Sequence, residues 1–136
     1  VKNKLYGVTY LENLKYLILQ FLKDFPNEDN DFITSEIKKN NIEFDLDFLK
    51  ILINYYDKTH SSIKFSCQND NLSIVISGFK KVTIFDSIEE NKSASLNISK
   101  NTGIVLSKNS IISQNIHSGS IILDILNKEN LKSAEI

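Results

Sequence analysis

The hydrophobic pattern changes its period within residues 44–78, and this change limits the possible folds more than any other feature. Apolar side chains in residues 46–56 recur at intervals of three or four, which predicts one apolar stripe along a helix. These side chains are Leu46, Leu49, Leu52, Ile53 and Tyr56. Residues 63–67 and 72–76 instead alternate between apolar and polar around a polar turn, which predicts a β-hairpin. A helix that leads directly into a hairpin forms one packing unit, because each presents one apolar face to the other.

A helix and a short strand are predicted before this unit. Residues 9–25 carry apolar side chains at helical spacing, and Pro26 then ends the predicted helix because its ring cannot continue one. Residues 32–37 contain β-branched side chains and precede the polar residues 38–41, so they are interpreted as a strand followed by a turn.

Four elements are predicted in residues 80–126. Residues 80–85 are expected to form a strand or a strand-like loop, and the polar residues 86–101 are expected to form a loop. Residues 104–116 have the apolar spacing of a third helix, which Gly119 follows at a position where glycine commonly ends helices. The near-continuous apolar run of residues 120–126 is typical of a strand that is covered on both faces.

This order of elements predicts an α+β fold. We expect a two-layer α/β sandwich, in which about three helices cover one face of a mixed, mostly antiparallel sheet that ends with a strand at residues 131–136. Residues 1–136 are expected to form one domain, because the chain is long enough for one core but not for two. The chain has no Met, even at position 1, and is therefore interpreted as a fragment of a longer protein.

The composition argues against several classes of function. All 16 basic residues are Lys, and nucleic-acid binding is not expected because base and phosphate recognition depends heavily on the guanidinium group of Arg. Cys67 is the single cysteine, so we expect it to act as a small hydrophobic residue rather than in a disulfide or a metal site. No apolar run approaches the ~20 residues of a membrane span, and no signal peptide precedes the first helix, so a cytoplasmic location is expected.

The order of elements resembles the ATP-binding domain shared by histidine kinases, gyrase-type enzymes and their relatives. In this resemblance Asn54 matches an Asn on the magnesium-binding helix, while Ser77 and Gly78 fall in the Asp-x-Gly box that ends a hairpin. Gly103 matches the glycine that opens a late helix, and residues 117–119 match the His-Gly-Gly-like turn that ends it.

Departures from that family argue against ATP binding. Ser77 stands where the adenine-reading Asp would be, and a hydroxyl cannot hold the exocyclic amine as a carboxylate does. No glycine lies between Gly78 and Gly103, whereas a phosphate-binding lid needs glycines so that backbone amides can approach the phosphates. We therefore expect neither a cofactor nor a metal, and we interpret Asn54, Ser77, Gly78 and Gly103 as degenerate family positions.

A kinase-like fold without its nucleotide-binding groups is similar to the C-terminal domain of the alphaproteobacterial histidine phosphotransferases (ChpT type). That resemblance implies a non-catalytic domain in a two-component phosphorelay, which helps the receiver domain of a response regulator to dock. It also implies a sensor histidine kinase as a partner, and a homodimer formed through a helical hairpin upstream of Val1. The phosphoryl-accepting His would lie in that hairpin, so no catalytic residue is expected within this chain.

Two other functions stay open at this point: an ATP-binding kinase domain of the histidine-kinase or anti-sigma type, and an unrelated α+β protein-interaction domain. His60 follows the predicted central helix and could accept a phosphoryl group, although a plain surface loop is the simpler interpretation. His117 is interpreted as a structural residue at the C-terminus of a helix. Lys80 and Lys81 are interpreted as solvated charges in a turn, and the serines of residues 107–113 as the polar side of a helix.

Overall fold

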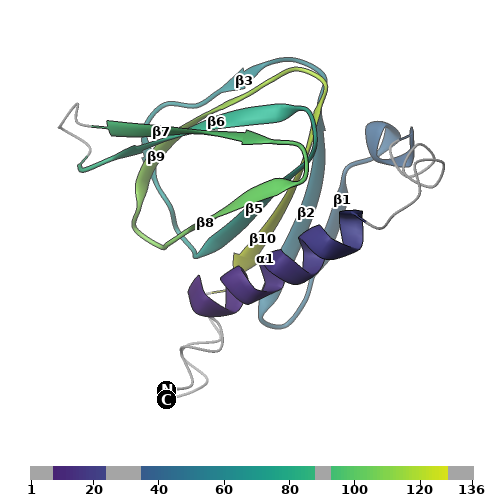
Figure 1. Ribbon diagram of the computed structural model, residues 1–136, viewed down its shortest axis with the longest axis horizontal. Helices are drawn as coiled ribbons and strands as arrows, with labels where there is room; N and C mark the ends of the chain where they lie inside the picture. Colours follow the sequence, from purple (N-terminus) through teal and green to yellow (C-terminus); the bar gives the residue numbers. More distant parts are fainter. Residues whose placement is uncertain (1–7, 24–34, 88–92, 129–136) are drawn as a thin grey trace.

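Two antiparallel sheets that pack face to face form the body of the molecule (Figure 1). The computed structural model describes residues 8–23, 35–87 and 93–128. Within these residues each sheet has five strands, and a long helix, α1 (Val8–Lys23), lies across the outside of one sheet. No helix in this described part of the chain is long and apolar enough to cross a membrane.

Sheet A is the sheet that lies next to α1. Its strands, in spatial order, are β1 (Ile42–Asp45), β2 (Leu49–Tyr56), β10 (Ser120–Asn127), β5 (Asn71–Ser77) and β8 (Thr102–Leu106). Every neighbouring pair is antiparallel. The central strand is β10, in which Ile122 lies opposite Asn54 of β2 on one side and Val75 of β5 on the other.

Sheet B faces the other side of sheet A. Its strands, in spatial order, are β3 (His60–Ser61), β9 (Ile111–Ile116), β6 (Phe79–Phe85) and β7 (Ser93–Ser99), and β4 (Phe65–Ser66) also pairs with β9. These pairs are antiparallel as well. Since β5 belongs to sheet A and β6 to sheet B, the chain crosses between the two sheets at the turn that joins these strands.

Two apolar layers hold these parts together. The layer between the sheets contains Cys67, Val75, Val82, Ile98, Leu106, Ile112, Ile116 and Ile122. The layer between α1 and sheet A contains Leu11, Leu49, Leu72, Ile74, Leu123 and Ile125. Because successive side chains of a strand point to opposite faces, β5 and β10 supply residues to both layers.

The helix predicted over residues 46–56 is wrong, because most of this segment forms strand β2. Leu49, Ile51 and Ile53 contribute to the layer next to α1, whereas Tyr56 packs against the layer between the sheets. A strand that is covered on both faces carries apolar side chains at mixed spacing. In this segment the mixed spacing imitates the period of a helix, which explains the wrong prediction.

Three further predicted elements are also wrong. Residues 104–116 are divided between strands β8 and β9, and Asn109 between them has a φ of 73°, which a right-handed helix cannot contain. The polar segment 86–101, predicted as a loop, contains strand β7. Residues 35–39 are helical, so the strand predicted at residues 32–37 is wrong where the structure describes it.

Four predicted elements are confirmed: the first helix as α1, the second strand of the hairpin as β5, residues 80–85 as β6 and residues 120–126 as β10. The hairpin itself is wrong, because β4 pairs with β9 in sheet B while β5 pairs with β8 and β10 in sheet A. The strand predicted at residues 131–136 lies outside the described residues. The predicted two-layer α/β sandwich is therefore wrong, and the fold is a mostly β sandwich of two sheets.

Gly78 makes the tight crossing between β5 and β6, with a φ of 83°. A Cβ atom added there would lie 2.8 Å from the Cα and Cβ atoms of Ser120, and nearer still to its Oγ atom. Ser120 is itself fixed, because its Oγ accepts a hydrogen bond from the amide of Phe79 and donates one to the Phe79 carbonyl, each at 3.1 Å. The crossing therefore has no room for a side chain at position 78.

We predict that Gly78→Ala lowers the free energy of unfolding by about 3 kcal/mol or more, because it combines a left-handed backbone with a steric clash. The matched control is Gly119→Ala, since Gly119 has a φ of 84° but nothing within 4 Å of the added Cβ. That control should cost only about 1–2 kcal/mol, the cost of the backbone conformation alone. Urea denaturation of both variants measures the difference, and equal losses would contradict the steric argument.

Candidate functional site

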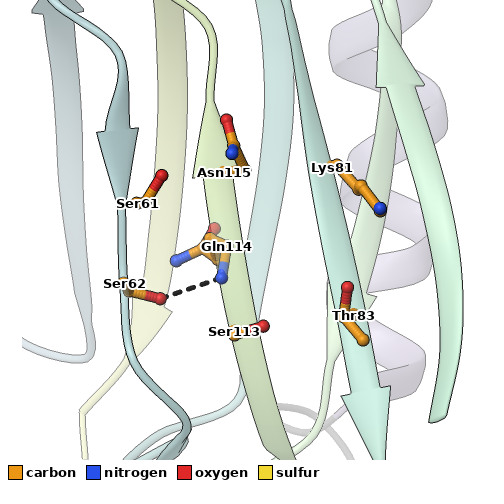
Figure 2. Close-up of a pocket in the computed structure, with 7 residues that line it drawn as sticks. All are labelled: Ser61, Ser62, Lys81, Thr83, Ser113, Gln114 and Asn115. Carbon is orange, nitrogen blue, oxygen red and sulfur yellow. Dashed lines mark hydrogen bonds between the residues drawn. The ribbon is translucent and has the colours of Figure 1, made fainter.

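A polar cleft of about 230 Å³ lies on the outer face of sheet B, the face turned away from sheet A. Seven residues line it: Ser61, Ser62, Lys81, Thr83, Ser113, Gln114 and Asn115. Figure 2 shows Ser61 and Ser62 on one side of β9, and Lys81 and Thr83 on the other side, on β6. We call this cleft the outer cleft.

Strand register places these side chains together. Lys81 lies opposite Asn115, and Thr83 lies opposite Ser113, so the polar residues of β6 and β9 face the same side. On the other edge of β9, Ser61 of β3 also lies opposite Asn115. The outer cleft is therefore built from three adjacent strands whose inward residues belong to the apolar layer between the sheets.

The wall beside β9 is held by a pair of hydrogen bonds. The amide of Ser62 donates to the carbonyl of Gln114 at 2.9 Å, and the amide of Gln114 donates to the Oγ atom of Ser62 at 2.8 Å. This second bond is drawn as a dashed line in Figure 2. Because the Ser62 hydroxyl is already engaged as an acceptor, the position of this wall is fixed before any ligand arrives.

A buried ammonium group lies on the opposite side of β6 from the outer cleft. Lys80 is only 1% exposed and points between the sheets, one residue before the exposed Lys81. Its Nζ atom donates to Ser73 Oγ at 2.5 Å and to Gln114 Oε1 at 2.6 Å. Since Ser73 belongs to sheet A and Gln114 to sheet B, these two bonds join the sheets through a polar contact inside the apolar layer.

Burial controls the protonation of the groups around this contact. Desolvation lowers the pKa of Lys80, while the charges of Asp124 and Cys67 act in the opposite direction. Desolvation also raises the pKa of the Cys67 thiol. Burial is the main cause that raises the pKa of Tyr56, and the charge of Asp124 raises it further. A hydrogen bond with Asn54 acts in the opposite direction.

The polar groups between the sheets do not suit a metal ion. Their centre is the cationic Lys80, with a hydroxyl and an amide oxygen as its partners. The residues that the structure describes contain no group of three or more His, Cys, Asp or Glu side chains that could hold a metal. A cation already occupies the position where a metal would need anionic or imidazole ligands.

The degenerate nucleotide-site residues lie on or beside three different strands of sheet A, and none of them lines the outer cleft. Asn54 lies in β2 opposite Ile122, and Ser77 ends β5 opposite Ile121. Gly103 lies in β8 opposite Ile74. Gly78 and Gly103 have structural roles instead, because a Cβ added at either one would come within 3 Å of a neighbouring residue.

Neither histidine stands at a helix end, so both sequence-based interpretations are wrong on this point. His60 lies in strand β3, with its ring 5.9 Å from the ring of Tyr56. His117 lies between β9 and β10 and stacks on Phe79 with 4.6 Å between ring centroids. The prediction that Cys67 is a buried hydrophobic residue is confirmed.

Lys80 and Lys81 are functional candidates that the sequence did not reveal, because they were interpreted as turn charges. Both lie in strand β6, where alternation places one lysine inside the sandwich and the other in the outer cleft. The available signal was the alternation of Lys80, Val82 and Ile84 with Lys81 and Thr83, because a strand was already predicted there.

No protein-family model and no curated protein sequence matches the chain, whereas solved structures share its fold. A cupin superfamily protein (DSY2733) from Desulfitobacterium hafniense superposes with a TM-score of 0.52 at 12% identity, over 66% of this chain and 79% of that one. KdgF from Halomonas sp. superposes with a TM-score of 0.51 at 12% identity, over 67% and 81% of the two chains. Drosophila melanogaster CENP-C, in its structure bound to CAL1, gives 0.52 at 10% identity, over 75% and 98%.

At these identities the likeness shows the fold alone, which is a cupin-like β-sandwich. The resemblance to histidine phosphotransferases is therefore wrong, and so is the phosphorelay function drawn from it, because that family has helices packed on a single sheet. The expected partners, a receiver domain and a sensor kinase, were inferred only from that resemblance and lose its support.

We predict that Lys80 makes the unfolding free energy rise with pH as the pH approaches 10.5, the ordinary pKa of a lysine. Its pKa is lowered by folding, so the unfolded chain binds more protons in the interval below that value. Tyr56 and Cys67, whose pKa values are raised, act in the opposite direction near their ordinary values of 10.0 and 9.0.

Comparison with Lys80→Met separates the lysine from these other groups. Urea denaturation at about pH 7.5 and about pH 10 should show the parent gaining stability relative to that variant, because below pH 10.5 the unfolded chain holds the lysine proton more tightly than the folded chain does. An equal difference between parent and variant at both pH values would contradict the prediction.

Proposed function

We propose that this cupin-fold domain is a ligand-binding domain that holds a small, oxygen-rich anion in the outer cleft. The observation that supports this most is the chemistry of the lining, in which Lys81 is the single ionised side chain among seven lining residues. The other six are Ser, Thr, Asn and Gln, all neutral hydrogen-bonding residues. Since the lining contains no carboxylate, its net charge is positive.

The charge of the outer cleft has two sources on one strand. Lys81 lines the cleft from the exposed side of β6 and can reach a ligand there, whereas Lys80 is buried behind the sheet and cannot. A charged Lys80 still contributes to the potential at the cleft, because Coulomb interactions are screened less in a protein interior than in water. Gln114 connects the two environments, as it lines the outer cleft and also accepts a hydrogen bond from Lys80.

The remaining lining groups suit a ligand with several oxygen atoms. The hydroxyl group of Ser113 can donate or accept, and the side chain of Asn115 offers two donors and an acceptor. The Thr83 hydroxyl shares a hydrogen bond with Ser95 and can still accept from a ligand. Hydrogen bonds from a charged ammonium to an oxyanion are stronger than those between neutral groups. We therefore assign the anionic group of the ligand to Lys81 and its hydroxyl groups to the serine, threonine and asparagine side chains.

The size of the outer cleft limits the ligand. Its volume of about 230 Å³ is below the ~300–1,000 Å³ of pockets that enclose drug-sized molecules. A sugar acid or a sugar phosphate has the matching chemistry, and carboxylate and phosphate share the oxyanion that Lys81 would bind. The cytoplasmic location expected from the sequence stays a prediction within this proposal.

We predict that glucuronate and glucose 6-phosphate bind in the outer cleft, while uncharged glucose binds much more weakly. Titration of the ¹⁵N-labelled chain should shift amide signals on β6 and β9. Lys81→Gln should weaken binding of the anions by about 10-fold to 100-fold, because a charge-assisted hydrogen bond contributes about 1.5–3 kcal/mol. The matched control is Lys100→Gln, since Lys100 is exposed in the turn between β7 and β8 and does not line the cleft.

The comparison of the three sugars decides which part of the proposal holds. Binding of only one anion identifies carboxylate or phosphate as the preferred group. Equal binding of glucose and its charged relatives, or shifts that avoid β6 and β9, would contradict the assignment of Lys81 as the anion-binding residue. Equal loss of affinity in Lys81→Gln and Lys100→Gln would mean that only general surface charge attracts the anion.

A further inference from the structure

Strand β7 (Ser93–Ser99) is an edge of sheet B. Within the described residues it pairs on one side only, with β6. It is the last strand in the spatial order of that sheet, next to β6. All of its residues except Ile98 are exposed. Backbone amides and carbonyls on an unpaired strand edge remain available to another strand.

The other sheet edges are protected in ways that proteins commonly use. Edge strand β1 of sheet A carries Glu43 and Asp45, which form ion pairs with Lys50 and Lys128. Charged side chains on an edge discourage pairing with another strand. Strands β3 and β4, at the far edge of sheet B, have only two residues each. Edge strand β8 contacts both α1 and β7, and all its residues except Thr102 are at least partly buried.

Strand β7 is neither charged nor short, although it contacts β8 in turn. Its seven residues are Ser93, Ala94, Ser95, Leu96, Asn97, Ile98 and Ser99, which include no charged residue and no proline. Long, exposed and uncharged edges are the ones that pair with another chain. Leu96 is 44% exposed although it lies opposite Val82, which is fully buried between the sheets. The edge therefore exposes a large apolar side chain at its centre.

The pattern of β7 is also symmetric about Leu96. Apolar Ala94 and Ile98 lie two residues away on either side, and polar Ser95 and Asn97 lie one residue away. If a second copy pairs antiparallel with Leu96 opposite its own equivalent, Ala94 faces Ile98 and Ser95 faces Asn97 of the other copy. Apolar side chains then meet on one face of the joined sheet, and hydrogen-bonding side chains meet on the other.

We propose that two copies of this chain pair through β7 around a twofold axis at Leu96, which joins their two B sheets into one antiparallel sheet. The interface is isologous, because the same strand of each copy contacts its equivalent. A second copy fits this edge better than an unrelated peptide does, because the strand is complementary to itself in this register. The two outer clefts then lie on one continuous face, each beginning at the strand next to β7. This dimer does not depend on the proposed ligand.

Sedimentation equilibrium over a range of concentrations tests the dimer. The parent chain should approach twice its mass of 15.5 kDa. In the double variant Ser95→Lys and Asn97→Lys, the introduced lysines of the two copies face each other, and the mass should fall to that of one chain. In the double variant Ser95→Lys and Asn97→Glu, each introduced lysine faces an introduced glutamate, and the dimer should return. Both variants lose the same exposed contact between Thr83 and Ser95, so this loss is matched between them.

A second experiment tests the register. Leu96 is the only residue of β7 that would face itself, so mild oxidation of Leu96→Cys should link two copies through a disulfide. Ser95→Cys faces Asn97 of the other copy and should not be linked. The native Cys67 is buried, so the parent chain under the same oxidation gives the background level of disulfide-linked copies.

Each experiment has an outcome that overturns the proposal. A parent chain that stays monomeric at every concentration excludes the dimer. A dimer that survives in the lysine pair, or that does not return in the lysine and glutamate pair, excludes β7 as the interface. Equal disulfide formation at positions 95 and 96 excludes the register, and this test remains decisive if a charged variant fails to fold.

Discussion

The fold depends on strand β10, which pairs on both edges and is covered on both faces. Its residues Leu123 and Ile125 belong to the apolar layer next to α1, whereas Ile122 belongs to the layer between the sheets. Pairing with β2 and β5 satisfies its backbone on both sides. Because side chains alternate along a strand, one strand fixes the position of the helix and of sheet B at the same time. A one-residue slip of its register would exchange the two layers, so the apolar run of residues 120–126 sets the register of the whole sandwich.

The lysine pair in β6 shows how the same alternation creates a functional surface. Burying an ammonium group is costly unless its donors are satisfied, and Lys80 reduces this cost by donating to one acceptor from each sheet. The next residue must then point outward, which places Lys81 in the outer cleft. An interior contact between the sheets and the charge of an exterior site thus follow from two adjacent residues of one strand. The Gln114 side chain fixes Lys80 from inside while its backbone forms part of the cleft wall.

Local sequence patterns identified the elements that are amphipathic or continuously apolar, and failed where a strand is covered unevenly. The first helix, β5, β6 and β10 could be predicted because each keeps one clear period or one unbroken run. Strand β2 could not, because Ile51 and Ile53 face the helix layer while Tyr56 packs on the other side, and together they imitate helical spacing. Strand β7 was hidden by its polarity, which results from its exposure at an edge. The outer cleft could not be predicted, since Ser61, Lys81 and Asn115 meet only through long-range strand pairing.

The two faces and the edges of this sandwich are not equivalent, and this asymmetry determines where ligands and partners can bind. Helix α1 covers the outer face of sheet A, so β5 and β8 offer no open surface on that side. Sheet B has no such cover on its outer face within the described residues, and the outer cleft lies there. Charge protects the edge at β1, short length protects the edge at β3 and β4, and α1 shields β8. Among the strands that the structure describes, this leaves β7 as the edge able to extend a sheet. Both the proposed ligand site and the proposed interface therefore fall on sheet B, because α1 covers the outer face of sheet A.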